Sequence, residues 1–459
     1  MFGGTPERNM ANVVDKSIAT DWSVEEGKQK NIKWSANLGT YSYGGPVVAG
    51  GKVFVGTNNA VPRDPKNKSK DKAVLMAFDE ADGKFLWQIV HDIPAQEVFS
   101  QVMNLGLLST PTVDGNEIYY VTPSCEVICA AIDEGKVLWR YDMMKELKVV
   151  PLHCGNCSPL VVGDRVYLMT GNGRNEDEKV PSPKAPSFIA LDKKDGKLVW
   201  QNSMPGENII EGQWSNPTLA TVGGKRQIIF PGGDAVLYSL EPDSGKLIWK
   251  FQSPRDKTKA SDPKIRQNYP ISTAVVAGDR LYLGLAVYPD GPGTELRYSH
   301  FLCLDITKTG DVSPASLDPQ AAASKNSALV WAYGGVIQPP PKKGRKVAFG
   351  KTLSTAAVHD GLVYISEENG YLHCLDARTG QKNWEYDFKS GIWGSPYYVD
   401  GKIYQGDSGG GVTIFEAGKK LRVIRQLDMD GNLEGTPVVA KGVLYIATRS
   451  KLYAIAEKK

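Results

Sequence analysis

The strongest constraint on the fold is an internal repeat. A phrase that runs through Gly, then Lys or Gln, to Trp closes five segments: "FDEADGKFLW" (78–87), "IDEGKVLW" (132–139), "LDKKDGKLVW" (191–200), "LEPDSGKLIW" (240–249) and "LDARTGQKNW" (375–384). Self-similarity at a regular period is typical of proteins built from one small unit used many times. We therefore expect one repeat architecture in this 459-residue chain, rather than the three domains that its length alone would suggest.

A second phrase occurs eight times. It is a short apolar stretch, a turn with Gly or Asp-Gly, and a second stretch that alternates apolar with polar residues, and it begins at residues 44, 109, 157, 215, 272, 354, 394 and 435. Copies such as "STPTVDGNEIYYVT" (109–122) and "GSPYYVDGKIYQGD" (394–407) have the pattern of a β-hairpin. The next segment and the Trp phrase supply a third and a fourth strand, so each unit is a four-stranded antiparallel propeller blade.

The predicted fold is all-β, an eight-bladed β-propeller over residues 30–459, preceded by an extension at 1–29. The last blade, 433–456, has no fourth strand of its own after "KLYAIAEKK", and we expect "NIKWSANL" (31–38) to complete it and close the ring. A column of Trp residues in the fourth strands is expected to pack between neighbouring blades. Its members are Trp34, Trp87, Trp139, Trp200, Trp249, Trp331 and Trp384; the seventh unit offers only Val423 or Ile424.

Units that run "P-V-V-x-G-x-x-Y" and then "A-L-D-x-x-T/D-G-K-x-x-W" resemble the pyrroloquinoline quinone (PQQ) repeat family. The resemblance extends from about residue 30 to the C-terminus. It implies one of two functions. One branch contains quinoprotein dehydrogenases, which hold PQQ and Ca²⁺ on the propeller axis. The other contains non-catalytic propellers similar to the lipoprotein subunit of the outer-membrane β-barrel assembly machinery. Either branch implies a periplasmic or other extracytoplasmic location, with any signal peptide outside the given chain.

Blade topology predicts which face carries a site. The first strands begin, and the blade-to-blade loops lie, on one side of the ring, here called the loop face. Long and dissimilar loops gather there, so a ligand or partner is expected on this face. The cofactor candidates of the dehydrogenase alternative are Trp214 and Trp393 as an aromatic floor, with Asn172, Asp234, Asp407 and Arg449 near the ends of second strands. Asn and Asp beside Gly are also common turn formers, which is the simpler interpretation of those positions.

Cysteine usage favours the non-catalytic branch. Quinoprotein alcohol dehydrogenases resemble one another in a disulfide between adjacent cysteines over the quinone, and this chain has no Cys-Cys pair. Cys125, Cys154 and Cys157 are expected on the loop face of adjacent blades, so a disulfide from Cys125 to Cys154 or to Cys157 is a hypothesis. A zinc site from these cysteines with His153 is a weaker alternative, since one CxxC without a second pair is a weak metal motif. No metal site is predicted.

The overall charge does not indicate a class of ligand, but local basic loops indicate where a partner could bind. Lys plus Arg number 54 against 51 Asp plus Glu, so the net charge of +3 gives no indication of nucleic-acid binding. Two basic loops on the loop face, 254–266 and 339–351, are candidates for docking an acidic protein surface or lipid headgroups, and a solvated surface is the simpler interpretation. Their basic residues are Arg255, Lys257, Lys264, Lys342, Lys343, Arg345 and Lys346. No apolar run approaches the length of a membrane span.

We therefore expect a non-catalytic, extracytoplasmic scaffold that binds protein partners through its loop face, with no catalytic residue and no cofactor. Membership in a larger membrane-associated complex is a related possibility. The alternative is a quinoprotein dehydrogenase that uses PQQ and Ca²⁺ to oxidise an alcohol or a sugar.

Overall fold

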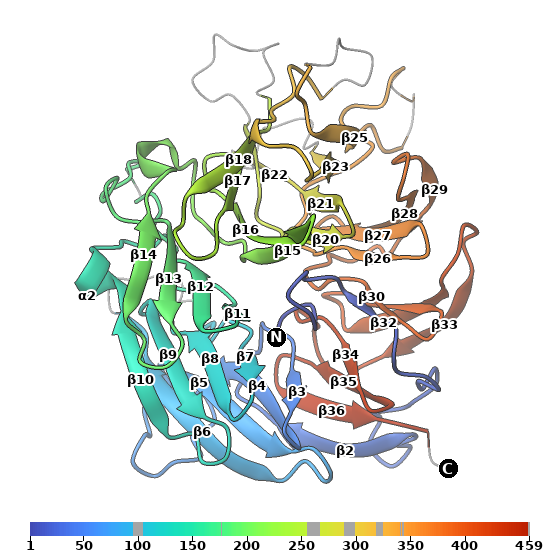
Figure 1. The fold of residues 1–459 in the computed structure, drawn as a ribbon. Helices are drawn as coiled ribbons and strands as arrows, with labels where there is room; N and C mark the ends of the chain where they lie inside the picture. Colours follow the sequence, from blue (N-terminus) through green and yellow to red (C-terminus); the bar gives the residue numbers. More distant parts are fainter. Residues whose placement is uncertain are drawn as a thin grey trace.

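A computed structural model describes residues 1–94, 104–175, 177–254, 267–288, 299–317, 325–339, 341 and 344–457. Over these residues, eight antiparallel four-stranded sheets stand in a ring, and the N-terminus lies at the centre of the ring (Figure 1). The predicted eight-bladed, all-β propeller is confirmed. The predicted hairpins correspond to strands one and two of each blade. The second strands do not alternate between buried and exposed residues as expected: Glu117–Val121 and Arg165–Met169 are buried at four consecutive positions, because each blade packs on both faces.

The strands of each blade follow one another outward from the axis. Blades one to four are β3 (Val47–Ala49), β4 (Lys52–Asn58), β5 (Lys72–Asp79), β6 (Phe85–Asp92); β7 (Thr112–Asp114), β8 (Glu117–Val121), β9 (Glu126–Ala131), β10 (Val137–Asp142); β11 (Leu160–Val162), β12 (Arg165–Met169), β13 (Phe188–Asp192), β14 (Leu198–Asn202); and β15 (Thr218–Val222), β16 (Lys225–Pro231), β17 (Val236–Leu240), β18 (Leu247–Gln252). Blades five to seven are β20 (Val275–Ala277), β21 (Arg280–Gly284), β23 (His300–Asp305), β25 (Leu329–Gly334); β26 (Ala357–His359), β27 (Leu362–Glu367), β28 (Tyr371–Asp376), β29 (Lys382–Asp387); and β30 (Tyr397–Val399), β31 (Lys402–Gly406), β32 (Gly411–Glu416), β33 (Val423–Asp428).

The eighth blade joins the two ends of the chain. It consists of β34 (Val438–Ala440), β35 (Val443–Ala447), β36 (Lys451–Ile455) and β2 (Ile32–Asn37). Strand β2 pairs antiparallel with β36 and places Trp34 opposite Ala454. This pairing confirms the predicted ring closure, which removes the unpaired edges that an open array would leave.

Several short elements lie outside the four-stranded blades. Strand β24 (Gly310–Asp311) adds to the outer edge of blade four, and β1 (Ala11–Asn12) adds to the inner edge of blade seven. Strands β19 (Gln267–Tyr269) and β22 (Ala286–Tyr288) pair as a separate ribbon. The helix α2 (Met143–Leu147) and the 3₁₀ turn η1 (Gly206–Asn208) lie between blades.

The Trp column explains the repeated turn phrase. The Trp87 indole donates from Nε1 to the carbonyl of Ile132 in the next blade at 3.0 Å. Gly135 of the next blade lies against the Trp87 indole, and a Cβ added at Gly135 would come within 2.6 Å of it. The φ of Gly135 is +69°. Glycine is therefore required twice at this turn, for its backbone conformation and for the close approach of the indole. Trp34, Trp139, Trp200, Trp331 and Trp384 make the same contact with the following blade.

Trp249 departs from this pattern. Its indole donates to Gln227 Oε1 within its own blade at 2.8 Å. The outer edge of blade four is covered by β24, which pairs alongside Trp249. Strand β24, which comes from the long insertion in blade five, thus takes the place of the contact that the other Trp indoles make with the turn of the next blade.

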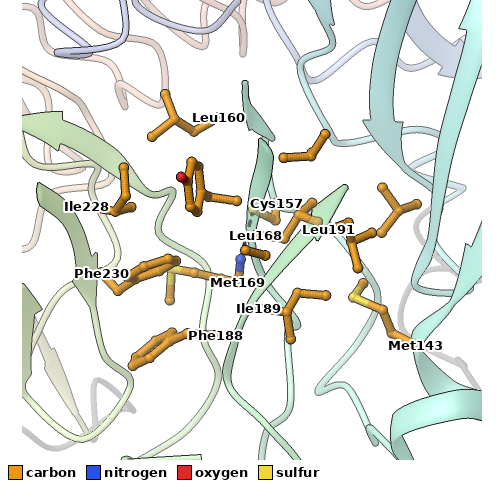
Figure 2. Packing of buried hydrophobic residues seen from close by; sticks show 14 of the residues in the cluster. Met143, Cys157, Leu160, Leu168, Met169, Phe188, Ile189, Leu191, Ile228 and Phe230 are labelled. Carbon is orange, nitrogen blue, oxygen red and sulfur yellow. Dashed lines mark hydrogen bonds between the residues drawn. The ribbon is translucent and has the colours of Figure 1, made fainter. Parts of the chain in front are cut away.

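A buried apolar core continues from blade to blade. Figure 2 shows Phe188 of blade three beside Phe230 of blade four, and Ile189 on the side toward Met143 of α2. The Phe188 and Phe230 rings stack at 4.7 Å between centroids. Each blade buries both of its faces, so the ring is held by side-chain packing around its whole circumference.

The N-terminal extension belongs to the ring. Trp22 is 3% exposed and packs in the core between blades seven and eight, where its indole lies 3.3 Å from Met429 Sδ. The register of the fourth strand corrects the predicted column position in blade seven: Arg425, opposite Ile414, stands where the other blades have Trp, whereas Val423 pairs with Phe415 beyond the bulge. Val423 and Ile424 are 38% and 39% exposed. Trp22 thus supplies the large aromatic group that the fourth strand of blade seven lacks.

Candidate functional site

A collar of small polar residues surrounds the axis on the loop face. One residue from each blade, just before the first strand, contributes: Gly45, Thr110, Ser158, Asn216, Thr273, Thr355, Ser395 and Thr436. Ser158 Oγ accepts a hydrogen bond from Thr110 N–H at 3.1 Å, and Asn216 Oδ1 accepts from Ser158 N–H at 2.6 Å. The collar therefore links neighbouring blades. Our sequence reasoning missed it, although the recurring Ser, Thr or Asn before each hairpin was a usable signal.

A cavity of about 520 Å³ opens above the collar. Three of the six predicted cofactor candidates line it, namely Trp214, Trp393 and Arg449. Phe2 of the N-terminal segment also lines it. The structure thus brings together, on the loop face, aromatic residues that lie far apart in the sequence.

One wall is an aromatic arc with an ion pair. The Tyr41 and Tyr43 rings stack at 6.1 Å, and the Trp393 ring meets Tyr43 edge-on at 5.4 Å. Arg449 lies over the Tyr41 ring at 4.5 Å and donates to Glu434 at 2.7 Å. Burial raises the pKa of the Glu434 carboxyl, and the adjacent guanidinium opposes that rise. Trp393 is 37% exposed, which makes it the accessible end of this arc.

The second aromatic surface pairs Trp214 with His153. Their rings are nearly parallel, with 6.0 Å between centroids and an interplanar angle of 4°. Burial lowers the pKa of His153, so the imidazole is neutral at physiological pH and stacks without the cost of desolvating a charge. Glu211 and Lys351 add charged groups to the lining.

The other three candidates serve the backbone outside the cavity lining. Asn172 accepts from Val150 N–H at 3.1 Å and donates to the Ser182 carbonyl at 2.9 Å. Asp407 accepts from Gly409 N–H at 2.7 Å. These are the turn and loop contacts of the simpler interpretation.

Asp234 is also occupied locally. Its carboxylate accepts from Val236 N–H and, at 2.5 Å, from the Tyr238 hydroxyl. Burial raises the pKa of Asp234 to about 6. The group is therefore engaged by its own hairpin rather than presented to the cavity as a base.

The cavity lining does not supply the oxygen ligands for Ca²⁺ that the dehydrogenase alternative predicts beside PQQ. Calcium binds six to eight oxygen ligands, mostly carboxylates and amides. The amide and the carboxylates predicted for that task are not among the residues that line the cavity, and Glu434 is paired with Arg449. Within the described residues, no group of three or more His, Cys, Asp and Glu side chains is placed to hold a metal ion.

The basic loops lie largely outside the described residues. Arg255, Lys257, Lys264, Lys342 and Lys343 fall there. Lys346 is exposed, and its part in docking a partner stays a prediction. Arg345 instead turns inward, pairs with the buried Glu367 and stacks over the Tyr371 ring at 4.2 Å.

The three loop-face cysteines remain candidates for a disulfide. All six cysteines are buried, and the structure draws no disulfide between them. Cys157 Sγ accepts a hydrogen bond from Met169 N–H at 3.4 Å within the core (Figure 2). Gly155, beside Cys154, packs against Cys125, because an added Cβ there would lie 3.0 Å from the Cys125 Cα. This geometry favours Cys154 over Cys157 as the partner of Cys125.

We expect mass mapping of unreduced peptides to find Cys125 linked to Cys154 in protein purified from an oxidising compartment. The bridge would close a loop of about 30 residues and stabilise the fold by about 3 kcal/mol in the chain-entropy model. Reduction should therefore lower the denaturation midpoint of the wild type and leave Cys125→Ser unchanged. Alkylation of all three of Cys125, Cys154 and Cys157 in unreduced, denatured protein would contradict the pairing.

A second cavity of about 570 Å³ lies between blades one and two, away from the axis. His91 lines it, is 7% exposed and shares a 2.8 Å hydrogen bond with the Tyr120 hydroxyl. Burial is the main cause that lowers the pKa of His91, to about 4, and nearby Arg140 adds to the effect. The imidazole is therefore kept neutral in the folded protein.

This burial predicts a pH dependence of stability. The unfolded chain takes up a proton at His91 near pH 6.5 and the folded chain only near pH 4, so stability falls as the pH is lowered through that window. The difference corresponds to about 3 kcal/mol. We expect urea denaturation of wild type and His91→Gln at pH 4 to 7 to show a steeper loss in the wild type. Parallel curves would contradict the assignment.

These observations define a class of protein: an eight-bladed propeller of PQQ-type repeats with an aromatic cavity at the loop-face end of its axis. The family model described as outer membrane protein assembly factor BamB matches residues 22–175, 71–285 and 320–459. The chain belongs to this family.

Individual relatives come from both branches of the fold. The chain is 22% identical to the outer membrane protein assembly factor BamB of Shewanella oneidensis over 81% of this chain and 71% of that protein. It is also 22% identical to a tetrathionate hydrolase of Acidithiobacillus ferrooxidans, over 68% of this chain and 64% of the hydrolase. The structure of the quinohemoprotein alcohol dehydrogenase ADHIIG from Pseudomonas putida HK5 superposes with a TM-score of 0.63 at 14% identity, covering all of this chain and 81% of that one.

The chain spans only part of the length of several curated relatives. Three alcohol and methanol dehydrogenases among the curated relatives are spanned over only 30% to 54% of their length. At 14% identity, the structural likeness shows the fold alone. Within the described residues, no helix combines the length and apolar character needed to cross a bilayer.

Proposed function

We propose that this chain is a non-catalytic, extracytoplasmic scaffold that binds a protein partner across the loop face. The observation that carries the proposal is the arc of Tyr41, Tyr43 and Trp393 beside the Arg449–Glu434 pair. Trp, Tyr and Arg clustered at the centre of a face are typical of the residues that dominate binding energy at protein interfaces. The family description, an assembly factor of the outer membrane, supports a partner in a membrane-associated complex.

The location of polar residues supports the same proposal. A quinoprotein site needs carboxylate and amide ligands facing the quinone. In this chain Asn172, Asp234 and Asp407 hold their own loops instead. The cavity therefore offers aromatic surface without the donor set of that chemistry.

Position-specific crosslinking tests the scaffold function. A photo-crosslinking amino acid at Trp393, on the loop face, should capture one partner in the cell envelope. The matched control is Asn116, which is exposed in the β7–β8 turn on the opposite face. Arg449→Ala should reduce the crosslink at position 393, because it removes the guanidinium that orders Tyr41. Equal yields from positions 393 and 116, or none from either, would contradict the proposal.

A second candidate, a PQQ- and Ca²⁺-dependent dehydrogenase of alcohols or sugars, has one observation in its favour. Trp214, Trp393 and Arg449 line one cavity, as a planar quinone would require. Calorimetry with PQQ and Ca²⁺, beside a dye-linked alcohol and glucose oxidation assay, separates the two functions. Tight one-to-one binding with turnover would replace the scaffold proposal and make Trp214 and Trp393 the first residues to change.

A further inference from the structure

The inner edges of the blades face the axis. In seven blades the first strand pairs with another strand on one side only, and in blade seven the inner edge of β30 is paired with β1. Such edges present backbone N–H and C=O groups that bind an extended peptide readily. In this chain, residues 5–12, here called the axial segment, run along these edges.

The axial segment visits consecutive blades in order. Leu219 N–H of blade four donates to the Pro6 carbonyl, and Val276 N–H of blade five donates to the Glu7 carbonyl, both at 3.0 Å. Tyr398 N–H of blade seven donates to the Met10 carbonyl at 2.9 Å. The Asn12 side chain donates to the Val439 carbonyl of blade eight at 3.2 Å. One short segment therefore uses the edges of several blades, rather than extending a single sheet.

Two side chains of the segment are recognised individually. Arg8 is fully buried, and its guanidinium donates to the carbonyls of Pro217, Ser158 and Phe2 at 2.9 to 3.1 Å. Asn9 makes a two-point contact with Val358, accepting from its N–H and donating to its carbonyl at 2.9 Å each. Replacing Arg8 would leave buried carbonyls without donors, which is costly in a site closed to water.

We propose that the axial edges of the first strands form a binding site for an extended peptide. Its ligand is the axial segment of the same chain, which the site recognises through the side chains of Arg8 and Asn9. Main-chain hydrogen bonds supply affinity, and the two side-chain contacts supply specificity and register, as in other β-edge recognition. The site adjoins the aromatic cavity proposed for the protein partner, because Phe2 and Ser158 line that cavity and also accept hydrogen bonds from Arg8.

The test cuts the segment free after the full chain has folded. Val13 and Val14 are 55% and 82% exposed, so a protease recognition sequence inserted between them is accessible. This position separates the axial segment from the Trp22 anchor. After cleavage, size-exclusion chromatography with mass spectrometry follows how fast the N-terminal fragment leaves the propeller.

We expect the wild-type fragment to co-elute with the propeller and to exchange with a labelled synthetic peptide of residues 1–13, but not with a scrambled peptide. Arg8→Met and Asn9→Ala should each release the fragment at least tenfold faster. Glu7→Gln is the matched control, because Glu7 accepts the hydrogen bond from Val276 through its backbone carbonyl. Denaturation of the uncut variants checks that they are folded. Immediate loss of the wild-type fragment, or equal release rates for all variants, would overturn the proposal.

Discussion

Trp22→Ala is expected to destabilise the protein by about 3–5 kcal/mol, the range for removal of a large buried aromatic side chain. Trp22 is 3% exposed and belongs to the core shared by blades seven and eight. Blade seven has no Trp in its fourth strand to limit the loss, since Val423 and Ile424 point largely to solvent. The cavity left behind would therefore lie at a blade interface. Urea denaturation followed by far-UV circular dichroism measures the effect.

Trp393→Ala is the matched control for this change. The same residue type is removed, but Trp393 is 37% exposed on the loop face. Its substitution should cost less than about 1 kcal/mol, as is usual for surface positions. A Trp22→Ala protein as stable as Trp393→Ala would show that the N-terminal extension is not part of the folded ring.

Arg345→Ala is expected to destabilise the protein by about 3–5 kcal/mol, because it leaves the carboxylate of Glu367 without its guanidinium in a buried site. Glu367 is completely buried, and without Arg345 its neighbour is the imidazole of His373, whose Nε2 lies 2.7 Å from Glu367 Oε1. Burial is the main cause that lowers the pKa of His373. The imidazole therefore compensates Glu367 poorly at neutral pH. Thermal and urea denaturation at pH 7 measure the loss.

The neighbouring position separates stability from partner binding. Lys346 is exposed in the same basic loop, and Lys346→Ala should change stability by no more than about 0.5 kcal/mol. Arg345→Lys should fall between wild type and Arg345→Ala, since lysine keeps the charge but loses the planar fork that stacks on Tyr371. If Arg345→Ala left stability intact and weakened only partner capture, Arg345 would be a docking residue as the sequence suggested.

The fold was predictable because the signal was repeated. One hairpin phrase carries little information, but eight copies, seven of them in units with Trp at a shared position, allow little other than a propeller. Ring closure followed from the same logic, because blade eight lacked a strand and Trp34 fell in the Trp column. Local rules of period and turn chemistry were sufficient at this level.

The site was only partly predictable. Trp214 and Trp393 were recognisable as Trp residues outside the column, and both reach the cavity. Tyr41, Tyr43 and Glu434 were missed, since they lie in connecting segments with no pattern that distinguishes them from ordinary loops. Arg345 was placed on the surface because its neighbours are basic, although the buried Glu367 draws it inward. Such pairings depend on distant residues and leave no local trace.

The sequence by itself determined the number of blades, the strand order and the residues that join one blade to the next, because each follows from short-range patterns repeated along the chain. Only the tertiary structure decided what the N-terminal residues do. Arg8 and Trp22 are an isolated charge and an isolated aromatic residue in the sequence. In the ring, one lies on the axis among carbonyls and the other fills the interface where the repeat is incomplete. Their roles come from closure of the ring, which brings residues more than 200 positions apart into contact and creates buried surroundings that no single segment possesses.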